Sequence, residues 1–253
     1  GCSGSSRDTN PPNHEFGQFI ADYFDAEYHN LAIPACTNFG IRLQIDHAID
    51  VLNADFVIIN ATTPTRIDFK INNSERYTHE NGWSNIDKTL LTDSIGSIFQ
   101  DDLSTSFEDN HIVKRLSKVM DADSHALFKL YFLHFYDPDI ERHKQFYMLQ
   151  NGLDRLLKNN IKFIFSPNTF EWAEGMSMSN SLLKYNLEPF KWHIPQENLL
   201  EKGIAEYLHV CDEVYGNWEN SPGPNYSHHL PIESHMQYSI DSIKHIKQNN
   251  LDK

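Results

Sequence analysis

Apolar side chains recur every three or four positions along much of this chain, and that spacing places them on one face of an α-helix. Two expected helix starts carry suitable residues, Asn38 and Pro138. An asparagine side chain at the N-cap accepts a free backbone N–H, and proline in the first turn has no N–H to satisfy. The pattern predicts helices over residues 13–24, 38–52, 111–135, 138–159, 196–208 and 231–247.

Short apolar runs between these helices predict β-strands. Residues 56–59, Phe-Val-Ile-Ile, are continuously apolar, which is typical of a central parallel strand covered on both faces. Two further strands are expected at residues 28–33 and 161–165. Because strands and helices alternate, the sequence predicts an α/β protein with a doubly wound parallel sheet.

The chain contains no internal repeat and no long linker, and its 253 residues suffice for one large α/β domain. Residues 70–135 are expected to form a helical and irregular insertion. The loop 60–66 follows the strand 56–59, at the edge where open α/β sheets bind ligands. We therefore expect a single domain over 1–253, with its functional site near that loop.

Charge and composition narrow the possible partners. The net charge of −14 argues against nucleic acid, whose phosphates bind clustered Lys and Arg. No apolar run approaches the roughly 18–20 residues that span a bilayer, so no membrane span is expected. The one tight group of histidines in the sequence, His228, His229 and His235, has no matching series of Cys or carboxylate residues, so no metal is expected.

The number and spacing of the cysteines indicate the cellular compartment. There are 3 of them, and no Cys-x-x-Cys motif occurs, which favours free thiols and a reducing environment. No basic and apolar leader opens the sequence. These features favour a cytoplasmic or virion-associated protein.

Candidate chemistry lies in two distant stretches, Gly1 to Ser6 and Asn225 to Pro231. A serine hydroxyl becomes a good nucleophile only when a neighbouring base takes its proton, and such pairs meet in space rather than in sequence. Ser3 is the candidate nucleophile, and His229 or His228 is the candidate base. The opening also fits a flexible Gly/Ser tail or a lipoprotein start acylated at Cys2.

Four stretches resemble conserved blocks of the SGNH (GDSL-like) hydrolases. Gly1-Cys2-Ser3 is similar to the first block, Gly-Asp-Ser, in the Gly-Cys-Ser form of phage and bacterial relatives. Residues 30–38, Asn-Leu-Ala-Ile-Pro-Ala-Cys-Thr-Asn, resemble the second block, Asn-Leu-Ala-x-Pro-Gly-x-Ser-Asn, and this is the most specific match. Residues 60–66 resemble a Thr-Ser-Pro-x-Arg form of the third block. Residues 229–235 resemble the fifth, with its His-Leu and a second histidine six positions on.

The resemblance implies a three-layer α/β/α sandwich with a flavodoxin-like parallel sheet, and a strand before Gly1. It also implies a serine esterase or acyl transferase that needs no cofactor and acts on an acyl ester of a small molecule or carbohydrate. Asn38 would bind the substrate. Arg66 would either bind it as well or pair with Asp68 in the same loop. The oxyanion would be held by the backbone N–H groups of Ser3 and Ala35 and by a hydroxyl of Thr62 or Thr63.

The chain departs from the family pattern at several positions. Ala35 replaces a glycine, the third block lacks its asparagine donor, and no carboxylate stands two or three residues before His229. A carboxylate from elsewhere, such as Asp8 or Glu219, would complete a triad. The alternative function is a catalytically weakened binding or structural module of the same fold, associated with a virion or an envelope.

Overall fold

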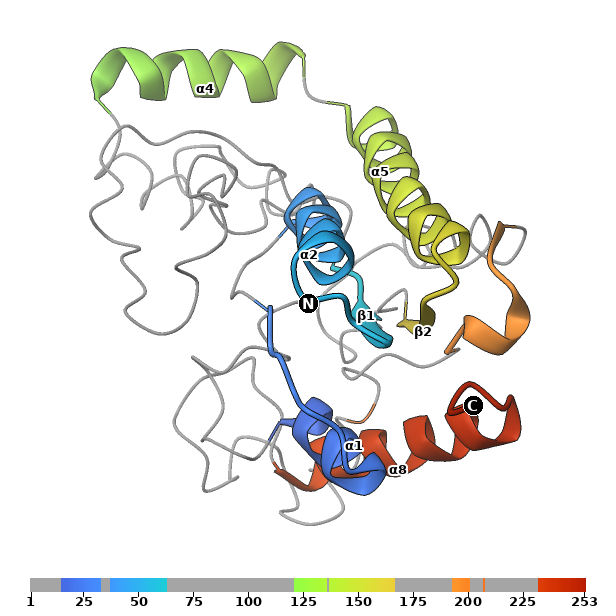
Figure 1. Ribbon diagram of the computed structural model, residues 1–253. Coiled ribbons are helices and arrows are strands. Elements are labelled where there is room, and N and C mark those ends of the chain that lie inside the picture. The colour runs from blue at the N-terminus through green and yellow to red at the C-terminus, as the bar shows by residue number, and fades with distance from the viewer. Residues whose placement is uncertain are drawn as a thin grey trace.

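The computed structural model describes residues 15–32, 37–62, 121–135, 137–166, 193–200, 207 and 232–253. Predictions that fall on other residues lie outside this part of the chain. Figure 1 shows the described elements, which are α1 (Phe16–Phe24), α2 (Asn38–Asp50), β1 (Phe56–Asn60), α4 (Ala122–His134), α5 (Pro138–Lys158), β2 (Lys162–Ser166), the 3-10 turn η5 (Gln196–Asn198) and α8 (Ile232–Gln248).

The described strands form a parallel pair, which confirms the α/β class. β1 and β2 are in register from Phe56 opposite Lys162 to Asn60 opposite Ser166. The pairing continues one residue past β1, where the Ala61 N–H donates to the Ser166 carbonyl at 2.8 Å. Such parallel pairing requires a long crossover, and α5 is the last element of that crossover before β2.

Helices pack on both faces of this two-stranded sheet, with α2 and α5 above it and α1 and α8 below it in Figure 1. Successive side chains of a strand point to opposite faces. Phe163 and Phe165 therefore lie in a core with α2 and α5, while Ile164 lies in a second core with α1 and α8. All three side chains are fully buried, as expected for a strand covered on both sides.

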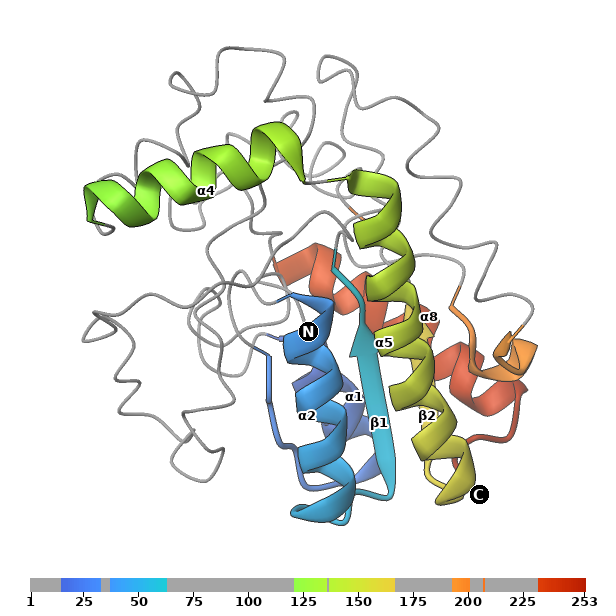
Figure 2. The same cartoon turned by 90° about the horizontal axis from the view of Figure 1, so that it is seen from above.

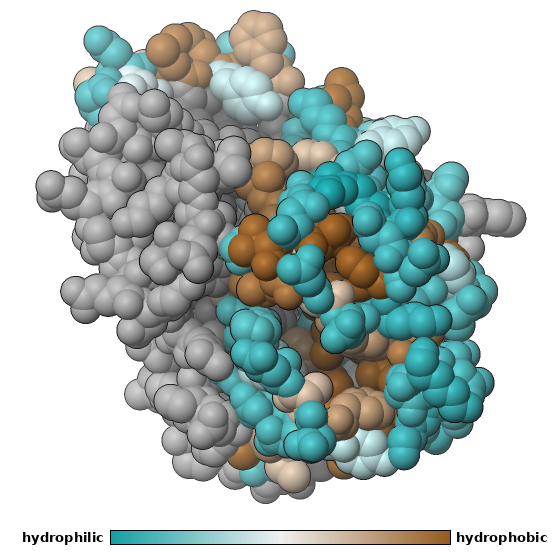
Figure 3. Space-filling view, in the orientation of Figure 1, coloured by the Kyte–Doolittle hydropathy of each residue, from teal (hydrophilic) through white to brown (hydrophobic). Residues whose placement is uncertain are grey.

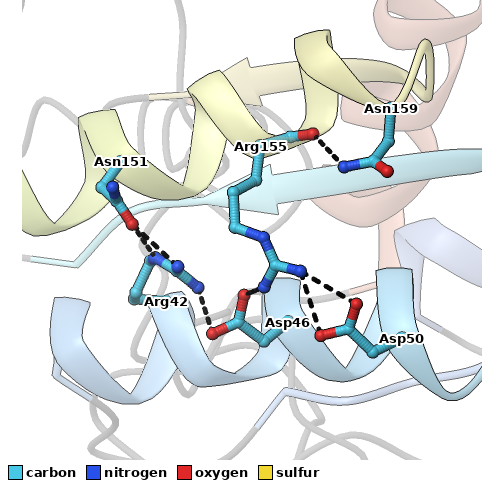
Figure 4. Close-up of polar contacts among 6 residues, drawn as sticks. All are labelled: Arg42, Asp46, Asp50, Asn151, Arg155 and Asn159. Atoms are coloured by element: carbon cyan, nitrogen blue, oxygen red, sulfur yellow. Dashed lines mark hydrogen bonds and ion pairs between the residues drawn. The ribbon is translucent and has the colours of Figure 1, made fainter.

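Charged side chains close the outer side of the α2–α5 contact (Figure 4). Arg155 of α5 reaches Asp46, and its guanidinium bonds both oxygens of Asp50 at 2.9 and 3.1 Å. Arg42 of α2 pairs with Asp46 and donates to the side-chain oxygen of Asn151 at 2.8 and 3.0 Å. One carboxylate, Asp46, is thus shared by two arginines from the two helices.

Four helices and two strands confirm the sequence predictions closely. α1, α2, α5 and α8 lie within the predicted ranges or one residue beyond them, and β1 and β2 begin and end within one residue of theirs. The described part of the predicted helix 111–135 is α4. Thr37, not Asn38, caps α2: its hydroxyl accepts the Gly40 N–H at 3.1 Å, and Asn38 is the first helical residue.

The predicted strand at 28–33 is wrong over its described residues, which are irregular. Two local contacts explain this. The Tyr28 ring lies so close to Gly17 of α1 that a Cβ at Gly17 would come within 2.5–2.7 Å of it. The Asn30 side-chain oxygen accepts the Ala32 N–H at 2.9 Å, and such local bonds compete with strand pairing.

The predicted helix at 196–208 is wrong over 196–200. Only the single turn η5 forms there, and Leu199 is extended beside β2. The Leu200 N–H donates to the Phe165 carbonyl at 2.9 Å, and the Asn198 side chain donates to the Phe163 carbonyl at 2.7 Å. These bonds satisfy the free edge of β2, which a helix would leave open.

α4 stands apart from both cores. Its described side chains include no buried one, and Figure 3 shows apolar side chains of this helix at the top of the molecule. The exposed apolar residues of the segment are Leu127, Leu130, Tyr131 and Phe135. Among the described helices, none combines the length and the apolar character needed to cross a bilayer.

Candidate functional site

The carboxyl ends of β1 and β2 meet at one edge of the sheet, here called the carboxyl edge. β1 ends at Asn60 and is followed by Ala61 and Thr62, and β2 ends at Ser166. All four residues are buried. Open parallel α/β sheets bind ligands outside this edge, so it is the first place to seek a site.

A buried asparagine fixes the chain just after β1. The Asn38 amide donates to the Thr62 carbonyl at 3.1 Å, and its oxygen accepts the Thr62 N–H at 2.9 Å. Both residues are 2% exposed. Because the side chain meets both backbone groups of Thr62, it replaces the strand partner that Thr62 would otherwise need. The start of α2 is thereby tied to the end of β1.

The Thr62 hydroxyl is a candidate donor at this edge. Its oxygen is enclosed and has no hydrogen-bond partner within the described part of the chain. Buried polar atoms without partners are uncommon, and many have a functional explanation. The hydroxyl is thus available to a group that the described residues do not supply.

A buried tyrosine ties α8 to the same edge. The Tyr238 hydroxyl donates to the Asn60 side-chain oxygen at 2.9 Å, and both residues are 1% exposed. The Phe16 ring meets the Tyr238 ring edge-on, at 4.8 Å between centroids. The first turn of α1 and the second turn of α8 therefore lie beside the end of β1.

α1 and α8 lie behind the strands in Figure 2, and their contacts show that they run side by side in the same direction. At their starts, the Phe16 N–H donates to Nδ1 of His235 at 3.3 Å. Near their ends, the Lys247 ammonium donates to the Tyr23 hydroxyl at 2.6 Å. Three helices, α1, α2 and α8, thus begin at the carboxyl edge, where the partial positive charge of each N-terminus favours negative charge.

Only part of the predicted site can be located. Asn38 and Thr62 are brought together as described above. The other predicted site residues lie outside the described part of the chain: Ser3, Ala35, Thr63, Arg66, His228 and His229.

In the sequence, some of these residues stand close to elements that meet at the carboxyl edge. Ala35 precedes the first residue of α2 by three positions, and Thr63 directly follows Thr62. His229 precedes the first residue of α8 by three positions in the sequence. Ser3 precedes Glu15, at the start of α1, by twelve positions.

Sequence reasoning missed three polar residues at this edge, Glu15, Asn60 and Tyr238. Asn60 could have been predicted from the sequence, because a polar residue that ends an apolar parallel strand lies at the ligand-binding edge. Nothing in the sequence distinguished Glu15 and Tyr238. A glutamate before a helix and a tyrosine within one are ordinary surface residues until long-range packing buries them.

Two titratable groups of α2 have shifted pKa values. Burial lowers the pKa of His47, near the opposite end of α2, and nearby His29 lowers it further. Burial also lowers the pKa of Arg42, against the opposing effect of Asp50. Within the described residues, no group of three or more His, Cys, Asp or Glu side chains is placed to hold a metal ion.

In comparisons with known proteins, no protein-family model, no curated protein and no solved structure matches this chain.

Proposed function

We propose that this protein is a serine-dependent ester hydrolase or acyl transferase of the SGNH type. Its 253 residues would form one domain, a three-layer α/β/α sandwich with a flavodoxin-like sheet. The observation that carries the proposal is the arrangement at the carboxyl edge. Thr62, the start of α2 and the start of α8 meet there, and each adjoins a stretch that resembles an SGNH block.

In the proposed reaction, the Ser3 oxygen attacks the acyl carbonyl carbon while His229 accepts the serine proton. The carbonyl π pair moves to the oxygen and gives a tetrahedral oxyanion. Collapse of this intermediate expels the alkoxide, which takes the proton from the imidazolium and leaves as an alcohol. Water, or another hydroxyl in a transferase, then attacks the acyl-serine by the same steps. His228 is the alternative base.

The oxyanion would be held by the backbone N–H groups of Ser3 and Ala35 and by a hydroxyl of Thr62 or Thr63. Thr62 is favoured because its buried hydroxyl has no partner among the described residues. Removing one such donor lowers the rate by about 10²–10³-fold in a serine protease. The positive ends of three helices would add to the stabilisation.

Asn38 and Arg66 are the two candidates for substrate binding. Both polar groups of the Asn38 amide are already bonded to Thr62, so Asn38 is better suited to holding the site than to binding the substrate. Arg66 is the proposed contact for a polar group of the substrate. The substrate class is an acyl ester of a small molecule or a carbohydrate, and no cofactor takes part.

Labelling with a fluorophosphonate probe tests the nucleophile directly, because the probe reacts with activated serines. We expect the wild-type protein to be labelled and Ser3→Ala and His229→Ala to lose labelling. Ser5→Ala, in the same Gly/Ser stretch, and His29→Ala, a half-exposed histidine beside Glu27, are matched controls that keep it.

The outcomes separate the two function classes. Loss of labelling in His228→Ala but not in His229→Ala would reassign the base and keep the enzyme. A folded wild-type protein that the probe does not label would refute the hydrolase and favour the non-catalytic binding module.

A further inference from the structure

The buried face of α5 changes from apolar to polar along the helix. Leu149, Leu153 and Leu156 are at most 1% exposed and lie in the core between α2 and the sheet. About one and two turns earlier, the same face carries Gln145 and Glu141, which are 2% and 8% exposed. Packing alone does not explain this change, because leucine at both positions would be buried without the loss of hydration that a polar group suffers.

The change occurs where α5 passes the carboxyl edge. α2 and α5 run in the same direction, because two contacts between them join residues 109 positions apart, Arg42 with Asn151 and Asp46 with Arg155. Adding this offset of 109 to 38 places Asn38, the first residue of α2, level with position 147 of α5. Gln145 and Glu141 therefore lie beyond the start of α2. In Figure 2, α5 continues past the start of α2 and past the arrowhead of β1.

The side-chain amide of Gln145 is held with its oxygen unused. Its Nε2 donates to one carboxylate oxygen of Glu141 at 2.9 Å, and the other oxygen meets the Lys144 ammonium at 3.4 Å. Because a carboxylate only accepts, the amide nitrogen must face it, and Oε1 is turned away. Oε1 is enclosed and has no hydrogen-bond partner within the described part of the chain. A buried acceptor is thus fixed in place for a donor that these residues do not supply.

The chemistry of these groups selects a neutral ligand with hydroxyl groups. The carboxylate of Glu141 disfavours an anion beside Gln145, and the Lys144 ammonium already balances that carboxylate. A hydroxyl group donates to the free oxygen of Gln145 without carrying a charge. At the same edge, the unpartnered Thr62 hydroxyl can either donate or accept. A ligand with several hydroxyls, as in a sugar, satisfies both residues.

We propose that the start of α5 forms one wall of a carbohydrate-binding site at the carboxyl edge. Gln145 accepts a hydrogen bond from a sugar hydroxyl, and Glu141 is a positioning residue that orients the amide. This inference goes beyond the proposed function, because sugar binding does not require an activated serine. Where both hold, the substrate is an acyl ester of a carbohydrate rather than of another small molecule.

Saturation-transfer difference NMR with the methyl glycosides of glucose, galactose, mannose and N-acetylglucosamine tests the site. We expect the wild-type protein to bind at least one of them. Gln145→Met keeps the length of the side chain and removes the acceptor, so it should weaken binding by about 10-fold or more. Gln150→Met is the matched control: Gln150 also donates to a carboxylate of α5, that of Asp154 at 2.8 Å, but it lies alongside α2 rather than beyond it. It should leave binding unchanged.

The double variant Glu141→Leu with Gln145→Leu separates binding from packing, because it extends the row of leucines on α5. Replacing both polar partners leaves neither one buried alone, so urea unfolding should show stability at least equal to that of the wild type, while sugar binding is lost.

Wild-type affinity in Gln145→Met or in the double variant would show that Gln145 bonds only an ordered water, and it would overturn the proposal. Failure of the wild-type protein to bind any of the four glycosides would overturn it too. Fluorophosphonate labelling is read separately from sugar binding. A labelled protein that binds no glycoside keeps the proposed function without the carbohydrate site, and an unlabelled protein that binds one keeps the site without the hydrolase.

Discussion

At the scale of single residues, two buried amides organise the end of β1. Asn38 binds the backbone of Thr62, and Asn60 accepts the Tyr238 hydroxyl, and all four residues are at most 2% exposed. Buried polar groups that are fully bonded favour one arrangement of their surroundings, whereas a half-bonded group is costly. The position of Thr62 is therefore determined by side chains far away in the sequence.

Asn38→Ala should destabilise the protein by about 2 kcal/mol, because it leaves the Thr62 N–H and carbonyl buried without their partner. Asn159→Ala is the control, since its exposed amide only donates to the Arg155 carbonyl, and it should change stability by less than about 0.5 kcal/mol. Urea unfolding of both variants measures the difference. Equal midpoints would show that the Asn38 contacts contribute nothing.

Asp121 should titrate below the ordinary range of an aspartate. The backbone N–H and then the hydroxyl of Ser124 bond its carboxylate at 2.8 Å each and lower its pKa. Because the pKa is lower in the folded state, the stabilisation of α4 is present above the unfolded pKa and is lost as pH falls through the folded pKa. NMR titration of Asp121 should show this low pKa, and Ser124→Ala should move it back towards the ordinary value.

At the scale of elements, the α2–α5 contact depends on the absence of one side chain. A Cβ at Gly152 of α5 would lie 2.9 Å from both Arg42 Cδ and Ile45 Cδ1 of α2. Ile45 is buried in the core and Arg42 is bonded to Asp46 and Asn151, so neither side chain can move away easily. The glycine thus lets two helices approach where any larger residue would separate them.

Gly152→Ala should therefore destabilise the protein, although alanine favours helix by about 1 kcal/mol over glycine. Overpacking of a close contact costs about 1–3 kcal/mol, so we expect a net loss of about 1 kcal/mol or more. The double variant Gly152→Ala with Ile45→Val removes the atom that the new methyl meets, and it should be less unstable than the sum of the two single changes. A Gly152→Ala protein more stable than wild type would contradict this packing.

Elements with strong local patterns were predictable, and those decided by tertiary contacts were not. The 3–4 spacing located α5, and the apolar run located β1, because each pattern requires burial of the face it defines. Residues 196–200 have helical spacing but bond to β2, since the free strand edge needs partners. Residues 28–32 have strand composition, yet the Tyr28 ring packs on Gly17 instead. At the candidate site, Asn38 and Thr62 were identified from the sequence, but the hydrogen bonds between them were not predicted.

At the scale of the whole molecule, order should decrease with distance from the sheet. β2 lies between the two cores, and Phe163, Ile164 and Phe165 are fully buried. α4 has no buried side chain among its described residues, and Leu127 and the C-cap residue Phe135 are 68% and 75% exposed. Opening of α4 therefore exposes little new apolar area, whereas opening of β2 requires disruption of both cores.

Hydrogen exchange should reveal this difference. We expect amides of β2 to exchange at least about 100-fold more slowly than amides in the middle of α4, because protection follows the free energy of local opening. Mass spectrometry of peptides that cover residues 122–134 and 162–166 measures it. Equal protection of the two segments would show that α4 is held by contacts outside the described residues.

The pairing of α1 with α8 has a consequence for the order of events during folding. Phe16 and His235, which meet at the starts of these helices, are separated by 219 positions in the chain. Closing so long a loop is entropically costly and is repaid only when both segments are present. During synthesis α1 therefore emerges long before α8, and Phe16 and Ile20 cannot pack against Tyr238 until α8 has followed. Over that interval the apolar face of α1 lacks the helix that covers it in the folded protein.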